Sequence, residues 1–114
     1  MPDCLFCKIR DGEIPAKIVF RDEECLAFED LRPQAPTHLL FIPLEHISTL
    51  NEVDLQNEAL VGHLVVTAAK HAKELGFSEA GYRLVMNCNR DAGQTVFHLH
   101  LHLLGGRPFE WPPG

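Results

Sequence analysis

Three histidines, His98, His100 and His102, are the residues of this chain best suited to chemistry. They alternate with large apolar side chains along residues 97–104, and strict alternation has the period of a β-strand. The three imidazoles are therefore predicted to share one face of a strand. The apolar residues predicted to face the core are Phe97, Leu99, Leu101 and Leu103. Next-but-one side chains on a strand lie roughly 7 Å apart, so the imidazoles can surround one small ligand.

The residues alone leave three interpretations of this histidine row. The first is a solvent-exposed face, although such faces usually carry Thr, Lys, Glu and Ser. The second is a metal site, since imidazole is the commonest protein ligand for zinc and H-x-H on a strand presents two of them. The third is covalent and acid–base chemistry, because an imidazole with an ordinary pKa near ~6.5 can act as nucleophile, base or acid.

Cys4 and Cys7 form a C-x-x-C motif, which is a second candidate for chemistry. A redox motif of this kind needs a preceding strand and a following long helix, and the pattern predicts neither. Zinc binding and a pair of small buried apolar side chains both remain open. Two thiolates do not complete a tetrahedral zinc site, so two further ligands would have to come from elsewhere.

Composition restricts the class of protein. The 114 residues correspond to one domain, residues 1–114, and their net charge of -6 argues against a nucleic-acid partner, which would favour a basic surface. No apolar run approaches the ~20 residues of a membrane span. No secretory signal is recognisable at the start of the chain, so we expect a cytoplasmic protein. In that reducing compartment the four cysteines are not expected to form disulfides.

Local patterns predict the elements that must position these residues. Hydrophobic runs and turn residues predict a hairpin, two further strands and one long helix, which is an α+β arrangement. His63 and His71 lie within the predicted helix and are interpreted as structural or solvent-facing. The predicted strands are 16–21, 25–29, 37–43 and 81–86, with a helix over 54–75 and a polar loop over 87–95. Gly93 in that loop lets backbone amides approach an anion closely, next to the histidine row.

The segment His98–Leu104 resembles the signature of the histidine triad (HIT) superfamily, and the resemblance extends from about Phe6 to the terminal Trp-Pro-Pro-Gly. It is closest to the Hint branch. The supporting segments are 8–9, 13–17, 33–38, 46–48, 81–83, 93–96 and 104–107. The resemblance implies a HIT-like α+β fold, with a mainly antiparallel five-stranded sheet, one long helix and one or more short helices. It further implies a homodimer with a continuous ten-stranded sheet, in which Trp111 lies near the partner's site.

The same resemblance implies a purine nucleoside phosphoramidase. His100 would attack the phosphorus of an AMP-amine, or possibly an aminoacyl-adenylate, and water would resolve the nucleotidyl-histidine intermediate. His98, His102 and His38 would form a polar relay that helps protonate the leaving amine. The residues implied to contact phosphate are Asn87, Gly93, Gln94, Thr95, His100 and His102. Those implied to contact the nucleoside are Leu5, Phe6, Ile9, Phe28, Glu29, Asp30 and Leu31, although Glu29 replaces a histidine of animal Hint proteins.

Bacterial members with an N-terminal C-x-x-C add a metal site to this expectation. The set that corresponds to their zinc ligands is Cys4, Cys7, His46 and His98, and a structural zinc is predicted without any organic cofactor. His98 would then be a ligand and not a relay group. Two alternatives of other classes remain: a nucleotide-binding or scaffold protein with vestigial catalysis, and a zinc hydrolase that uses the histidine row as its three ligands.

Overall fold

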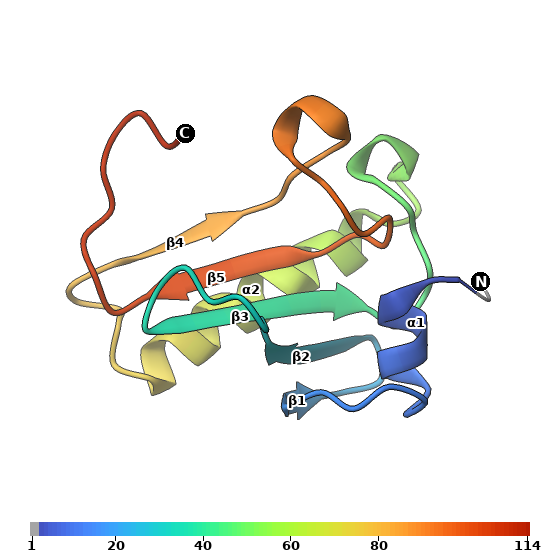
Figure 1. Ribbon diagram of the computed structural model, residues 1–114, viewed down its shortest axis with the longest axis horizontal. Helices are drawn as coiled ribbons and strands as arrows, with labels where there is room; N and C mark the ends of the chain where they lie inside the picture. The colour runs from blue at the N-terminus through green and yellow to red at the C-terminus, as the bar shows by residue number, and fades with distance from the viewer. Residues whose placement is uncertain (1–2) are drawn as a thin grey trace.

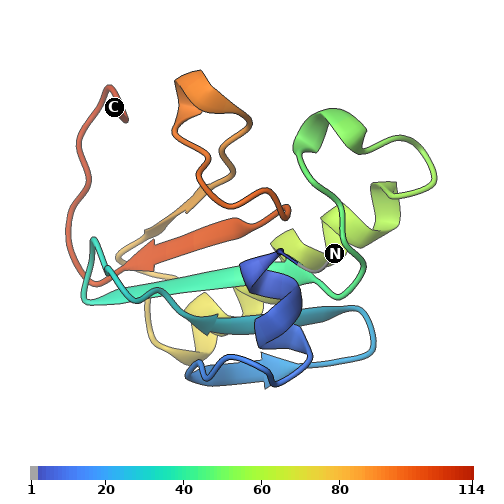
Figure 2. The same cartoon turned by 45° about the vertical axis from the view of Figure 1, so that its right-hand side comes forward.

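The computed structural model describes residues 3–114, which form one antiparallel sheet with a helix on each face (Figures 1 and 2). The strands are β1 (Ile18–Arg21), β2 (Cys25–Glu29), β3 (Thr37–Pro43), β4 (Tyr82–Val85) and β5 (Leu101–Gly105). The helices are α1 (Leu5–Arg10) and α2 (Glu58–Glu74), with short 3₁₀ turns at Leu50–Glu52 and Arg90–Ala92. The predicted α+β architecture with one long helix is confirmed.

The sheet order is β1-β2-β3-β5-β4, and every neighbouring pair is antiparallel. The nearly continuous apolar strand β3 occupies the centre, as expected for a strand buried on both faces. It pairs with β5, so that Leu40 lies opposite His102 and Phe41 opposite Leu101. The most central strand therefore supports the strand that carries His102, the last histidine of the row.

The two faces of the sheet have different partners, because successive side chains of a strand point to opposite sides. On one face, Ala27 and Phe41 belong to a buried core completed by Leu64 and Ala68 of α2. On the other face, α1 packs Phe6 and Ile9 onto a second core; its sheet residues are Leu26, Phe28, Leu40 and Ile42. Figure 2 shows α1 in front of the sheet and α2 behind it.

The segment of the histidine row differs from its prediction in two respects. The strand does not begin at residue 97 but at Leu101. Upstream of it, the backbone N–H of Leu99 donates to the carbonyl of Ile47, 2.6 Å away, and not to β3. Phe97 was predicted to face the core, but 49% of its surface is exposed, whereas Leu99, Leu101 and Leu103 are buried as predicted. The prediction failed at Phe97 because the chain leaves the sheet there, so the side-chain alternation no longer maps onto two sheet faces.

The remaining elements follow the sequence prediction closely. The hairpin and β3 lie where the hydrophobic runs placed them, and α2 starts four residues later than the predicted helix, after turns at residues 55–57. Among residues 3–114, no helix is both long and apolar enough to cross a bilayer. The ten-stranded dimer sheet stays a prediction.

Candidate active site and metal-ligand cluster

A cavity of about 330 Å³ opens between α1 and the sheet; we call it the main cavity. Two of the three histidines of the row, His100 and His102, line it. All seven residues predicted to contact a nucleoside also line it: Leu5, Phe6, Ile9, Phe28, Glu29, Asp30 and Leu31. The structure therefore brings the predicted nucleoside set and two triad histidines together in one space.

The walls of the main cavity combine an apolar interior with a polar rim. Phe6 and Phe28 meet edge to face, with ring centroids 5.3 Å apart. At the rim, the Glu29 carboxylate lies 3.4 Å from the ammonium of Lys17, and 90% of Leu31 is exposed. The Asp30 carboxylate accepts from the N–H of Arg32 through Oδ1, which leaves Oδ2 3.4 Å from the imidazole of His38.

His100 is held as a neutral imidazole with one defined tautomer. Its Nδ1–H donates to the carbonyl of His98 at 2.7 Å, so Nε2 carries the lone pair. Burial lowers the pKa of His100, and the hydrogen bond to the carbonyl only partly opposes this effect. The ring is 8% exposed and contacts Phe6 edge to face, with centroids 5.1 Å apart. An unprotonated Nε2 on a fixed ring has the properties of a nucleophile.

His102 has the opposite tautomer, and His38 sets it. The backbone N–H of Gln34 donates to Nδ1 of His38 at 3.0 Å, so the proton of a neutral His38 lies on Nε2. That Nε2–H points at Nδ1 of His102, 2.8 Å away, and leaves the His102 proton on its own Nε2. Burial and the neighbouring imidazoles of His100 and His38 lower the pKa of His102 to about 4. His100 and His102 thus carry their protons on opposite ring nitrogens, His100 on Nδ1 and His102 on Nε2.

The loop before the histidine row is stiffened by Gln94. Its side-chain amide donates to the carbonyls of Ser48 (2.9 Å) and Val96 (3.1 Å), and its oxygen accepts from the N–H of Asn89 (2.8 Å). These bonds engage the side chain with backbone, so any contribution of Gln94 to a ligand would come from holding the loop. Gly93 adopts a left-handed conformation (φ +86°) that favours glycine.

The four loop residues predicted to contact phosphate do not all reach the main cavity. Thr95 lines it, together with Val96, whereas Asn87, Gly93 and Gln94 are not among the lining residues. A second cavity of about 420 Å³ shares Thr95 and Val96 with the main cavity, and it includes Cys4 and His46.

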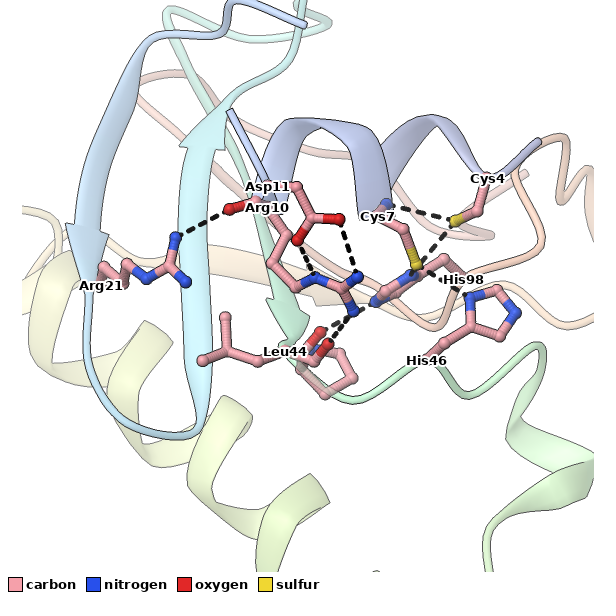
Figure 3. Close-up of polar contacts among 9 residues, drawn as sticks. Cys4, Cys7, Arg10, Asp11, Arg21, Leu44, His46 and His98 are labelled. Carbon is pink, nitrogen blue, oxygen red and sulfur yellow. Dashed lines mark hydrogen bonds and ion pairs between the residues drawn. The ribbon is translucent and has the colours of Figure 1, made fainter. Parts of the chain in front are cut away.

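Cys4, Cys7, His46 and His98 form one compact group, which we call the metal-ligand cluster (Figure 3). Their candidate ligand atoms all lie within 4.8 Å of one another. Nδ1 of His98 lies 3.4 Å from the Cys4 sulfur and 3.5 Å from the Cys7 sulfur, and Nδ1 of His46 lies 3.3 Å from the Cys7 sulfur. The short helix α1, the loop after β3 and the segment before β5 thus converge on one point.

The donor set fits a zinc ion. With Zn–S near ~2.3 Å and Zn–N near ~2.0 Å, a tetrahedral site separates sulfur and nitrogen by about 3.5 Å, which matches the observed separations. The Nε2–H of His98 donates to the carbonyl of Pro43 at 2.9 Å, so Nδ1 presents its lone pair to the sulfurs. Burial and the neighbouring Cys4 raise the pKa of the Cys7 thiol, and a divalent cation would favour the thiolate instead. A bound ion would supply four fixed bonds that join these segments.

The histidine row does not converge on a single ion. The side chain of His98 belongs to the metal-ligand cluster and is fully buried, whereas Nδ1 of His100 is engaged with a carbonyl and Nδ1 of His102 with His38. This geometry is unfavourable for the zinc hydrolase interpretation with three triad ligands. It also separates the side chain of His98 from the pair formed by His38 and His102.

A further group, Asp22, Cys25 and His63, lies between the hairpin turn and α2, with candidate ligand atoms within 4.8 Å of one another. Its groups already have protein partners: Oδ1 of Asp22 accepts from the N–H groups of Glu24 and Cys25, and Oδ2 lies 2.6 Å from Nε2 of His63. Burial raises the pKa of the Cys25 thiol to about 12. We therefore interpret it as a structural link between β2 and α2.

Three aromatic residues outside the main cavity, His71, Phe109 and Trp111, differ in how they are packed. His71 packs edge to face between Phe20 and Phe41, which confirms its structural interpretation. In the C-terminal tail, Phe109 lies under the guanidinium of Arg107 (4.3 Å), whereas 84% of Trp111 is exposed. Trp111 does not line the main cavity of its own chain.

Sequence reasoning missed several residues of the site. The main cavity is also lined by Ile14, Pro15, Ala16, Arg32, Leu40 and Val96. The backbone N–H of Gln34 and the carbonyl of Pro43, which fix the tautomers of His38 and His98, were also missed. Backbone groups carry no residue-type signal, so only the folded chain reveals them. For Leu40 a signal was available: successive side chains of a strand point to opposite faces, so Leu40 must lie on the face opposite Leu39 and Phe41.

Comparison with known proteins gives consistent matches. The HIT domain family model matches residues 11–109. The purine nucleoside phosphoramidase of Escherichia coli K12 is 50% identical over 106 residues, which cover 93% of this chain and 89% of that protein. The crystal structure of a HIT family hydrolase from Legionella pneumophila is 57% identical, with a TM-score of 0.96 and coverage of 98% of this chain and 100% of that one.

A zinc-bound histidine triad family protein from Mycobacterium smegmatis is 33% identical, with a TM-score of 0.80, and the match covers 93% of this chain and 76% of that one. The family model spans most of the chain, and the relatives cover it almost from end to end. The chain therefore belongs to the family of HIT domain proteins.

Proposed function

We propose that this protein is a purine nucleoside phosphoramidase, which cleaves the P–N bond of nucleoside 5′-phosphoramidates such as AMP-amines. The observation that carries the proposal is the tautomer of His100, which lines the main cavity: its Nδ1–H donates to the His98 carbonyl, so Nε2 keeps its lone pair. The 50% identity to the phosphoramidase of Escherichia coli supports the same reaction.

The first half of the reaction transfers the nucleotidyl group to the protein. Nε2 of His100 attacks the phosphorus, a P–N bond to the imidazole forms, and the bond to the leaving amine breaks. The nitrogen of the leaving amine gains one proton that enters from solvent by way of Nε2 of His102, so that His102 ends this step as a neutral imidazole, and His38 holds His102 in the required tautomer. Thr95, at the cavity wall, is positioned to donate to a phosphate oxygen.

The second half releases the nucleotide. A water molecule attacks the same phosphorus, His102 accepts the proton of that water, and the bond to His100 breaks to give AMP and the free imidazole. The purine lies between Phe6, Phe28 and the neighbouring apolar residues, and Asp30 at the rim accepts from the ribose hydroxyls. Asn87, Gly93 and Gln94 shape the loop that carries the phosphate contacts.

The variants His100→Ala and His100→Asn test the proposal. Both should bind AMP nearly as well as wild type but lose at least about 10³-fold of the turnover of adenosine phosphoramidate, the order expected when a nucleophile is removed. Turnover close to wild type in either variant would contradict the assignment. AMP binding without any turnover by the wild-type protein would favour the scaffold alternative.

Two further features belong to this proposal. Zinc occupies the metal-ligand cluster, and metal analysis of protein purified without chelator should find about one equivalent per chain; absence of metal would contradict it. The protein is a cytoplasmic homodimer, in which a partner covers the exposed Trp111. The sheet has two edge strands, β1 and β4, and we propose that β4, the neighbour of β5, extends the sheet across such an interface.

A further inference from the structure

Helix α1 serves the metal-ligand cluster and the main cavity at once. Cys4, its N-cap residue, and Cys7 belong to the cluster, whereas Leu5, Phe6 and Ile9 line the cavity. The helix has six residues, and helices this short are not stable in isolation because nucleation is unfavourable. Its position therefore depends on its contacts with the rest of the chain. The sulfurs of Cys4 and Cys7 make such contacts, and the two cysteines flank the cavity-lining residues Leu5 and Phe6 in the sequence.

The polar contacts of α1 other than the sulfurs lie at its far end. Arg10 donates to the carbonyl of Leu44 at 2.7 Å, and Arg21 donates to the carbonyl of Arg10 at 3.0 Å (Figure 3). At the first turn, the N–H of Cys7 donates to the Cys4 sulfur at 3.3 Å, and both sulfurs approach Nδ1 of His98. Apart from the apolar packing of Phe6, the first turn is thus held by the polar contacts of the metal-ligand cluster.

Phe6 connects this anchored turn to the proposed nucleophile. Its ring contacts Phe28, His98 and His100 edge to face, with centroid separations of 5.3, 6.0 and 5.1 Å. A shift of α1 would therefore change both the wall against which a base packs and the ring that supports His100.

A second connection runs through the main chain of a single residue. The imidazole of His98 is fixed on one side by the carbonyl of Pro43 and on the other by the sulfurs of the cluster. The carbonyl of the same residue accepts the Nδ1–H of His100 at 2.7 Å. Fixing the His98 side chain consequently fixes the acceptor that determines which nitrogen of His100 attacks.

We propose that the metal-ligand cluster positions the nucleoside wall and the His100 nucleophile, so that metal binding and nucleotide binding strengthen each other. This inference rests on the proposed function, because it takes the main cavity as the nucleotide site. Cys4, Cys7 and His46 are positioning residues in this account and touch no substrate. By thermodynamic linkage, AMP must raise the affinity for the metal by the same factor by which the metal raises the affinity for AMP.

Calorimetric titration of AMP into metal-free and zinc-loaded wild-type protein tests the coupling. Near-ultraviolet circular dichroism establishes that the metal-free form is folded. We expect zinc to tighten AMP binding by about tenfold, within the roughly 5- to 150-fold range of coupled sites. In the reciprocal experiment, zinc is titrated against a chromophoric chelator with and without AMP, and the same factor should appear.

Two variants distinguish an effect of the metal-ligand cluster on AMP binding from a general loss of stability. His46→Gln removes a cluster residue that does not line the main cavity, and His63→Gln removes a histidine from the other face of the sheet. We expect His46→Gln to weaken zinc and to bind AMP as weakly as the metal-free protein, and His63→Gln to retain both affinities. If metal-free wild type does not stay folded, the AMP affinities of His46→Gln and His63→Gln still test the coupling.

The outcomes distinguish this inference from the proposed function. Equal AMP affinities with and without zinc, or an AMP-independent zinc affinity, would overturn the coupling and leave the phosphoramidase assignment intact. Failure of AMP to bind either form would overturn both. Absence of zinc binding to wild type would overturn the inference and the proposed zinc occupancy, and it would leave the phosphoramidase assignment intact.

Discussion

Two main-chain carbonyls and the imidazole of His38 set different protonation patterns on the neighbouring histidines His98, His100 and His102. The Nδ1–H of His100 donates to the carbonyl of His98, and the Nε2–H of His98 donates to the carbonyl of Pro43. The Nε2–H of His38 donates to Nδ1 of His102. Under the proposed function, these three identical side chains serve as a nucleophile, a metal ligand and a proton donor. Their division of roles follows from position in the fold and not from residue type.

The variant His38→Ala tests the proton-donor role of His102. Without the imidazole that fixes the His102 tautomer, kcat for an AMP-alkylamine should fall by about 10²-fold, a typical contribution of general acid catalysis. AMP affinity should change little. The first release of p-nitrophenolate from an AMP p-nitrophenyl ester needs no proton and should be nearly unaffected in single-turnover kinetics.

His71→Ala is the matched control for His38→Ala, because His71 packs between two phenylalanines on the opposite face of the sheet. It should lower stability without changing kcat. Equal losses for the alkylamine and the nitrophenyl ester in His38→Ala would argue against the relay.

The sequence and the family resemblance predicted most of the residues that meet in the site, although Asn87, Gly93 and Gln94 do not line the main cavity. They did not predict how the histidines are protonated. The spacing of Cys4 and Cys7 indicated half of a zinc site, and the family resemblance supplied His46 and His98, which the structure brings together. The N–H of Gln34 could not be foreseen, because every residue except proline has one.

Among the elements, β5 depends on close packing as well as on hydrogen bonds. Gly105 pairs with Thr37 of β3 and Tyr82 of β4, and a Cβ at this position would come within 2.7 Å of the ring of Phe77. The glycine therefore allows the segment after α2 to cross close to the end of the strand that carries His102.

The variant Gly105→Ala should lower the free energy of unfolding by about 1–3 kcal/mol, the usual effect of overpacking. Urea denaturation measures this change. Gly62→Ala is the control, since no atom lies within 4 Å of a Cβ at this helical position, and removing an interior helical glycine is neutral or stabilising by up to about 1 kcal/mol. Equal stability of Gly105→Ala and wild type would show that Phe77 moves aside freely.

Periodicity predicted the elements best where a strand stays within the sheet. Strand β3 has the predicted bounds, because its apolar side chains fill both cores. Residues 97–100 have the same alternation as β5 but leave the sheet, since their backbone is held by the loop at Ile47. That contact joins segments about fifty residues apart, and no local pattern contains it.

For the whole molecule, the pair Asp22 and His63 links the β1–β2 turn to α2 across the face opposite the main cavity. Burial alone would raise the pKa of Asp22, but hydrogen bonds from Glu24, His63 and Cys25 outweigh it and lower the pKa to about 2. The ordinary value is 3.8, so the folded state favours the carboxylate. This stabilisation is present above pH 4 and is lost as the pH falls towards 2.

Asp22→Asn keeps the oxygen that caps the turn but removes the charge. Wild type should be more stable than this variant by about 1–2 kcal/mol at pH 6, a value reduced for partial exposure of the pair, and the difference should shrink between pH 4 and pH 2. Urea denaturation at a series of pH values measures it. A difference independent of pH would contradict the electrostatic interpretation.

The proposed reaction depends on covalent nucleotidylation of His100, and direct detection of this intermediate tests it. Wild-type protein is mixed with a slowly hydrolysed AMP-amine, quenched in alkaline denaturant that preserves phosphoramidate bonds, and mapped by peptide mass spectrometry. We predict an adenylyl group on His100 and none in His100→Ala. Steady turnover with no adduct on His100, or an adduct on another residue, would contradict the account.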